Sequence, residues 1–147
     1  MRKFLFFALA LVAGALAFTS CDNGNSVDSP LVGKWFTQPA EDLYDEITFD
    51  GKGNYVAVED YYFYDDAGKL IPTPHEHVVI KGSYTIDGDI ATVHQTSQTI
   101  SMDGGKAENI EWEPTDEQMK FKVEGKTLTL TRNYGTDYAW DLILTKK

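Results

Sequence analysis

The stretch Gln118–Asn133, QMKFKVEGKTLTLTRN, decides the fold class. Apolar and polar residues alternate on both sides of Glu124-Gly125, and a period of two is the pattern of a half-buried β-strand. A glycine after an acidic residue supplies the positive φ that a tight hairpin needs. The stretch therefore predicts a β-hairpin with Glu124 and Gly125 as its two-residue turn.

This hairpin register gives one apolar face and one polar face. The predicted cross-strand pairs are Val123 with Lys126, Phe121 with Leu128, Met119 with Leu130 and Glu117 with Arg132. Arg132 lies on the apolar side, where a charge without a partner costs several kcal/mol. We expect Glu117 or an aromatic ring to be its partner.

The same alternation continues through the chain from Leu31 to Lys147. Val, Ile, Thr, Tyr and Phe are abundant, and no segment has apolar residues at helical spacing for more than a turn. The predicted strands are Leu31–Thr37, Leu43–Phe49, Tyr55–Tyr64, His77–Ile86, Asp89–Ile100, a short one near Ala107–Trp112, Gln118–Val123, Thr127–Asn133 and Tyr138–Thr145. Asp50-Gly51 and Asp87-Gly88 mark further hairpins.

A chain of such hairpins predicts an all-β, antiparallel, up-and-down meander of eight or nine strands. A meander of this length either stays open or closes into a barrel. We favour the barrel, because closure removes the exposed strand edges.

The N-terminal segment has the layout of a secretory signal peptide. Arg2 and Lys3 precede an apolar run from Phe4 to Phe18, which is too short to cross a bilayer comfortably as a helix. Phe18-Thr19-Ser20-Cys21 resembles the bacterial lipobox, in which the cysteine receives lipid and the residues before it are removed. An ordinary signal peptide with a stray cysteine is the alternative.

If Phe18–Cys21 is interpreted as a lipobox, the chain has three parts. Residues 1–20 are then the signal peptide, residues 21–30 a flexible tether from the lipidated Cys21, and residues 31–147 the barrel domain. The barrel is anchored to a membrane of the bacterial cell envelope through this lipid. We favour the outer membrane, and the periplasmic or surface side is left open.

The charge balance excludes some partners. The full chain carries a formal net charge of −10, and both basic residues of the signal peptide are lost on its removal. So acidic a domain repels nucleic acid and anionic lipid headgroups. We expect no nucleic-acid partner, and contact with the membrane only through the lipid on Cys21.

Gly33-Lys34-Trp35 early in the first strand gives a family resemblance. A Gly-x-Trp motif on the first strand of an exported, antiparallel, all-β chain is similar to the lipocalin and fatty-acid-binding (calycin) group, and to small lipocalin-like bacterial lipoproteins in particular. The resemblance implies that Trp35 closes one end of the barrel and that Arg132 packs across its ring. The helix that usually follows the late strands of lipocalins is absent from the sequence pattern.

Aromatic and polar residues provide candidates for a ligand-binding cavity. Rings at a barrel mouth stack on sugars or apolar ring systems, and polar inward residues suit a wet cavity. The candidate lining residues are Tyr55, Tyr62, Tyr64, Gln95 and Ser97. After Asp87-Gly88 the shortest turn directs Gln95, Ser97 and Thr99 inward together with Ala91 and Val93, and a longer turn reverses this. Core packing and solvated surface are the alternative roles.

Motifs for metal binding and catalysis are weak. His75 and His77 share one face of a strand at a spacing that zinc or copper can use, but both point outward when Val78 and Ile80 face the core. We therefore expect solvated histidines and no metal. The chain has no Gly-x-Ser-x-Gly, Walker or His-Glu-x-x-His motif. We expect no enzymatic activity and no cofactor.

Two functions fit these observations. The first is a membrane-anchored, lipocalin-like lipoprotein that binds a small apolar or amphipathic ligand. The second is a non-catalytic interaction module, an accessory subunit of an envelope assembly whose barrel is filled by its own side chains. Barrels of about eight strands have room for either. An enclosed apolar pocket of a few hundred Å³ favours the first.

Overall fold

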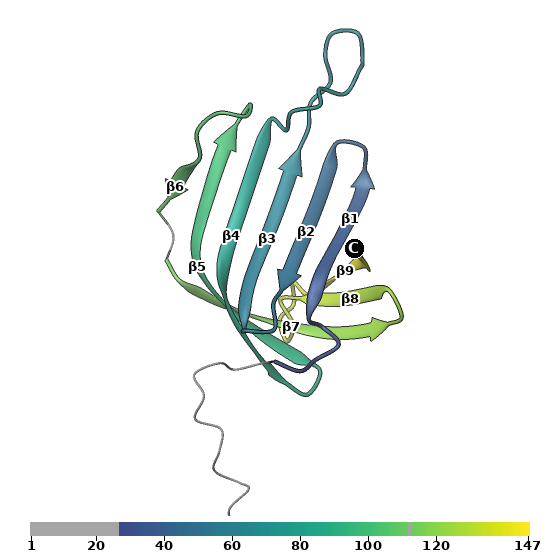
Figure 1. The fold of residues 1–147 in the computed structure, drawn as a ribbon, viewed down its shortest axis with the longest axis vertical. Helices are drawn as coiled ribbons and strands as arrows, with labels where there is room; N and C mark the ends of the chain where they lie inside the picture. Colours follow the sequence, from purple (N-terminus) through teal and green to yellow (C-terminus); the bar gives the residue numbers. More distant parts are fainter. Residues whose placement is uncertain (1–26, 112) are drawn as a thin grey trace, which may run out of the picture.

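The computed structural model describes residues 27–111 and 113–147, and these residues form nine strands (Figure 1). The strands are β1 (Gly33–Ala40), β2 (Leu43–Phe49), β3 (Asn54–Tyr61), β4 (Glu76–Asp87), β5 (Ile90–Met102), β6 (Glu108–Ile110), β7 (Thr115–Glu124), β8 (Thr127–Arg132) and β9 (Trp140–Lys146). The predicted signal peptide and Cys21 lie outside the described residues. Within the described residues, no helix has the length and apolarity needed to cross a bilayer.

The strands close into an antiparallel barrel. The order around it is β4-β3-β2-β1-β9-β8-β7-β5, and β5 pairs again with β4 along its whole length. β6 pairs with β5 beyond the segment that pairs with β7, for example Gln98 with Ile110. It therefore stands outside the ring. The prediction of an all-β meander that closes into a barrel is confirmed. Eight strands form the ring, and the short strand β6 is attached to it.

The two ends of the barrel differ. β7 pairs with β5 only from Ile90 to Gln95, and β1 pairs with β9 only at Trp35 with Lys146 and Phe36 with Thr145. Strands β7–β9 therefore cover one half of the barrel, and β1–β5 continue beyond them as a curved sheet (Figure 1). We call the half that contains β7–β9 the closed end and the other half the open end.

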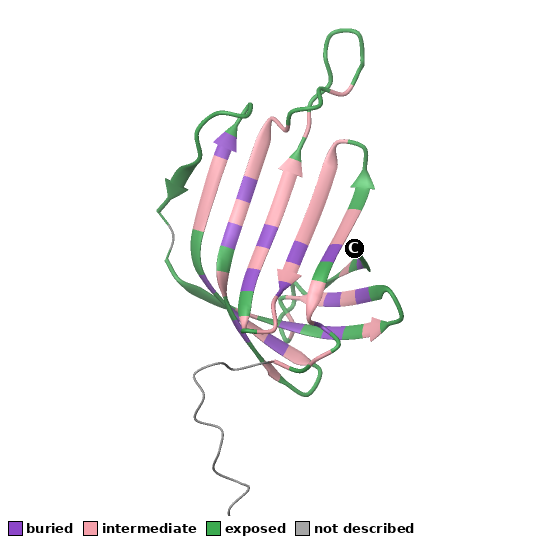
Figure 2. Cartoon of the chain, in the orientation of Figure 1, coloured by how far each residue is buried: buried purple, intermediate pink, exposed green. Residues whose placement is uncertain are grey.

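The hydrophobic core fills the closed end. Trp35, Leu128, Leu130 and Leu144 are fully buried, and the indole N–H of Trp35 donates to the carbonyl of Leu31 at 2.8 Å. Full burial of one such side chain contributes about 1.5–3 kcal/mol. Figure 2 shows buried segments alternating with partly buried or exposed ones along several strands, as expected for strands with one face inward.

The β7–β8 hairpin has the predicted inward face but a different register. Glu124 pairs with Thr127 and Phe121 with Leu130, so the turn residues are Gly125 and Lys126. Gly125 has φ 61°, and glycine first in the turn is typical of a type II′ hairpin. The predicted register was wrong by two residues. A shift of two keeps every side chain on its predicted face.

A β-bulge changes the inward residues in the middle of β5. Lys81 pairs with Ser97 and Gly82 with Gln95, so one extra residue, Thr96, lies in β5. Ala91, Val93 and Gln95 are buried as predicted. Beyond the bulge the alternation is reversed, so the prediction that Ser97 and Thr99 face inward was wrong.

Gly82 lets the two strands approach closely at this bulge. A Cβ atom at Gly82 would lie 2.0 Å from the carbonyl oxygen of His94. No side chain fits at that distance. Gly82 therefore fixes the place where β4 and β5 bend from the open sheet into the closed end.

The C-terminus is tied to β2 by Glu46 on the outer surface. The Glu46 carboxylate accepts hydrogen bonds from Lys147 at 2.7 Å, from Lys34 at 2.9 Å and from the Tyr44 hydroxyl at 2.8 Å. Burial opposes the charged form, but the hydrogen bonds from Lys147, Lys34 and Tyr44 outweigh it and lower the pKa of Glu46 to about 2. This contact reinforces the short β1–β9 seam.

The described part of the predicted tether lies against the closed end. The amide of Val27 donates to the carbonyl of Gly51 at 2.8 Å, and the Val27 side chain packs against the core. Leu31 is fully buried. The chain therefore enters the barrel beside the β2–β3 turn.

Candidate binding pocket

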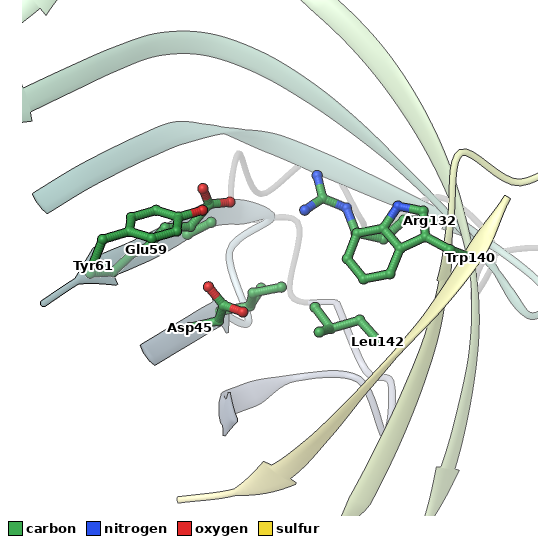
Figure 3. Close-up of a pocket in the computed structure, with 9 residues that line it drawn as sticks. Asp45, Glu59, Tyr61, Arg132, Trp140 and Leu142 are labelled. Atoms are coloured by element: carbon green, nitrogen blue, oxygen red, sulfur yellow. The ribbon is translucent and has the colours of Figure 1, made fainter. Parts of the chain in front are cut away.

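A pocket of about 170 Å³ opens inside the barrel where the core ends. It lies between β2 and β3 on one side and the region of Arg132 and β9 on the other (Figure 3). Its lining residues are Asp45, Ile47, Ala57, Val58, Glu59, Tyr61, Arg132, Trp140 and Leu142. The pocket thus combines charged groups, aromatic rings and aliphatic side chains.

Two carboxylates, Asp45 and Glu59, lie on the β2–β3 side of the pocket, and we call this pair the acidic wall. Asp45 precedes the buried Ile47 by two residues, and Glu59 follows the buried Ala57 by two, so both side chains face inward. The strand register places Asp45 directly opposite Glu59. Burial raises the pKa of each carboxyl group, and the charge of Arg132 opposes that rise.

Arg132 and Glu117 form a mostly buried ion pair across from the acidic wall. The carboxylate of Glu117 accepts from Nε of Arg132 at 3.0 Å and from Nη2 at 2.8 Å. It also accepts from the Asn133 amide at 3.2 Å and from the Gln95 side chain at 3.3 Å. Burial opposes the charged guanidinium, but the hydrogen bonds to Glu117 outweigh it and raise the pKa of Arg132.

Trp140 completes the pocket beside Arg132. The guanidinium carbon of Arg132 lies 5.7 Å from the centre of the Trp140 ring, and the Trp140 residue is 47% exposed. Figure 3 shows Arg132 and Trp140 facing Glu59 and Tyr61 across the gap. A ligand in this pocket would contact both sides.

The expected stacking of Arg132 on Trp35 is corrected by the structure. The cation over the Trp35 ring is Lys146, whose Nζ lies 5.2 Å from the ring centre. Arg132 lies over Trp140 instead. Trp35 does fill the closed end, as its complete burial indicates, and Glu117 is the carboxylate partner that the inward position of Arg132 requires.

The five candidate lining residues are not among those that line the pocket. Tyr55 and Gln95 face inward and are buried, but they lie deeper, towards the closed end. Tyr62 and Tyr64 follow the last residue of β3, and Ser97 is exposed beyond the bulge. Alternation along β3 puts Tyr61 on the inner face with Ala57 and Glu59, so the ring that reaches the pocket is that of Tyr61.

Tyr55 ends near the charged groups without a hydrogen-bond partner. The side chain is fully buried, and its hydroxyl has no partner among the described residues. Burial raises the pKa of the Tyr55 phenol, and the charges of Arg132, Glu117 and Glu59 act on it. A hydroxyl without a partner among the described residues therefore lies in the core below the pocket.

Each histidine contacts one aspartate. The Nδ1 atoms of the three histidines contact carboxylates, in the pairs His75–Asp103, His77–Asp60 and His94–Asp116. His75, just before β4, pairs with Asp103 just after β5, whereas His77 on β4 pairs with Asp60 on β3. In the described part of the chain, no three His, Cys, Asp or Glu side chains are arranged to hold a metal ion.

The sequence analysis missed Asp45, Glu59, Tyr61 and Trp140. A signal for the first two was present, since each carboxylate stands at an inward position of an alternating strand. Comparison with known proteins adds no assignment: no protein-family model and no curated protein matches this chain.

Proposed function

We propose that this protein is a lipid-anchored lipoprotein of the bacterial cell envelope that binds a small amphipathic molecule without transforming it. The pocket between the acidic wall and Arg132 carries the proposal. It joins apolar side chains to a few convergent polar groups, which is the usual composition of a small-molecule site. It also lies inside a barrel of the size that holds one small ligand.

The pocket volume sets the size of the ligand. About 170 Å³ is less than the few hundred Å³ that a drug-sized molecule needs. It is close to the cavity of about 150 Å³ that binds benzene in an engineered protein core. We therefore expect the ligand, or the part of it that enters, to have about six to ten non-hydrogen atoms.

The proposed anchor agrees with the position of the pocket. The described chain begins at Val27 beside the β2–β3 turn, which belongs to the closed end. A lipid on Cys21 would attach that end to the membrane and leave the open end free. We favour the outer membrane for this anchor.

An interaction module is the second candidate function. It is favoured by the closed end, which is filled by the protein's own side chains, including Trp35, Phe49 and Tyr55. In this case the pocket is only the boundary of the core on the side of the open end. The barrel would then serve as an accessory subunit of an envelope assembly.

Native mass spectrometry of the purified protein distinguishes the two functions. The ligand-binding function predicts a retained molecule of small mass that is lost on denaturation. If no molecule is retained, and no compound in a screen of small amphipathic molecules binds, the result would favour the interaction module. Intact mass of the wild type and of Cys21→Ser tests the anchor, since only the wild type should carry the mass of acyl chains.

A further inference from the structure

The acidic wall has an uncompensated negative charge inside the barrel. Asp45 and Glu59 both face the pocket, and neither carboxylate has a hydrogen bond or an ion pair among the described residues. The only described cation that lines the pocket is Arg132. Its charge is already matched by Glu117 through two hydrogen bonds.

The arrangement of the two carboxylates is unfavourable without a partner. Asp45 and Glu59 are directly opposite in the β2–β3 register. Like charges at directly opposite positions destabilise a sheet. Their partial burial adds to this cost, because it weakens the shielding of the repulsion by water. A cation placed between them would remove the repulsion.

The surroundings of the acidic wall fit an organic cation. The rings of Tyr61 and Trp140 line the same pocket, and aromatic faces attract ammonium and guanidinium groups. Ile47 and Leu142 offer aliphatic contacts to an apolar body. An anion would meet two unpaired carboxylates, and a metal ion would meet no group of three ligands among the described residues.

On the inner face of β3, below the acidic wall, Tyr55 carries a further polar group without a partner among the described residues. Its hydroxyl is fully buried and unpartnered, and it lies within the influence of Glu59 and Arg132. A buried polar group without a partner is rare in proteins. Tyr55 does not itself line the pocket, so a bridging water is what could link this hydroxyl to a bound ammonium.

We infer that Asp45 and Glu59 together bind the cationic head of the ligand, a protonated primary amine or guanidinium on a small apolar body. Trp140, Tyr61 and Leu142 contact that body. The inference rests on the proposed function, because it requires that the pocket takes up a small molecule.

Three probes of similar size and different charge test the inference. They are 2-phenylethylamine, 2-phenylethanol and phenylacetate, and their binding to the purified protein is measured by isothermal titration calorimetry at neutral pH. The amine should bind at least tenfold more tightly than the alcohol. Phenylacetate should bind most weakly.

Variants locate the effect at the acidic wall. Asp45→Asn and Glu59→Gln should each weaken amine binding at least fivefold and leave binding of the alcohol unchanged. Asp66→Asn, which removes an exposed carboxylate from the loop after β3, is the matched control and should bind the amine like the wild type. Circular dichroism confirms that each variant is folded.

The outcomes separate this inference from the proposed function. Equal binding of all three probes, or amine binding that is unchanged in both acidic-wall variants, would overturn the inference and leave the ligand-binding function standing. No binding of any probe and no retained molecule in native mass spectrometry would overturn both.

Discussion

Replacing Glu117 by glutamine should destabilise the barrel strongly. The change preserves the shape of the side chain and removes the charge that compensates Arg132. The two side chains are only 17% and 11% exposed, so the guanidinium would remain buried without its partner. Breaking a buried pair by removing one partner costs about 3–5 kcal/mol. We expect about 3 kcal/mol, because Asp45 and Glu59 still attract Arg132.

Thermal unfolding followed by far-UV circular dichroism measures this effect. A domain of this size loses about 3–5 °C in melting temperature for each kcal/mol, so we expect a decrease of about 10 °C. Glu124→Gln is the control, since its pair with Lys122 is about 70% exposed on both sides and contributes at most about 1 kcal/mol.

A double-mutant cycle completes the test. Arg132→Met alone leaves Glu117 without its cation, whereas Arg132→Met combined with Glu117→Gln removes both charges. The double variant should be less destabilised than the sum of the single variants. A loss below about 1 kcal/mol in Glu117→Gln would refute the reasoning that this pair is buried and coupled.

Three further predictions concern stability. Gly82→Ala should lower the free energy of unfolding in urea by at least about 1–3 kcal/mol, because its Cβ would lie 2.0 Å from the His94 oxygen, and an unchanged midpoint would contradict the bulge. Because folding lowers the pKa of Glu46 from 4.5 to about 2, its stabilisation is complete above pH 4.5 and is lost as the pH falls towards 2. Glu46→Gln should therefore lose about 1 kcal/mol at neutral pH and converge with the wild type near pH 2 in acid denaturation, whereas parallel curves would refute this. Asp45→Asn or Glu59→Gln should raise the melting temperature at neutral pH, since each removes one charge of a directly opposed pair, and a decrease would contradict that pairing.

The fold was predictable because its local signals agree with one another. Alternation from Thr127 to Arg132 identified the inner face of β8, and the inward position of Arg132 correctly required a partner such as Glu117. The glycine at position 125 identified the hairpin. Its sequence did not distinguish Glu124-Gly125 from Gly125-Lys126 as the turn, because both place glycine at a position that accepts positive φ.

The pocket was less predictable because it depends on contacts between distant strands. The bulge opposite Gly82 reverses the alternation of β5, and the sequence around Ser97 carries no local mark of it. The open end exists because β7–β9 stop short of the full height of β5, and strand pattern does not give the length of pairing. Asp45 and Glu59 were inward by alternation, but their opposition follows only from the β2–β3 register.

The most direct test of a ligand site in the open half of the barrel is a search for intermolecular nuclear Overhauser effects with 2-phenylethylamine bound to the purified protein. We predict contacts from the ring protons of the ligand to the methyl groups of Ile47 and Leu142 and to the indole of Trp140. Contacts confined to exposed outer residues such as Ile71 and Ile110 would contradict the account.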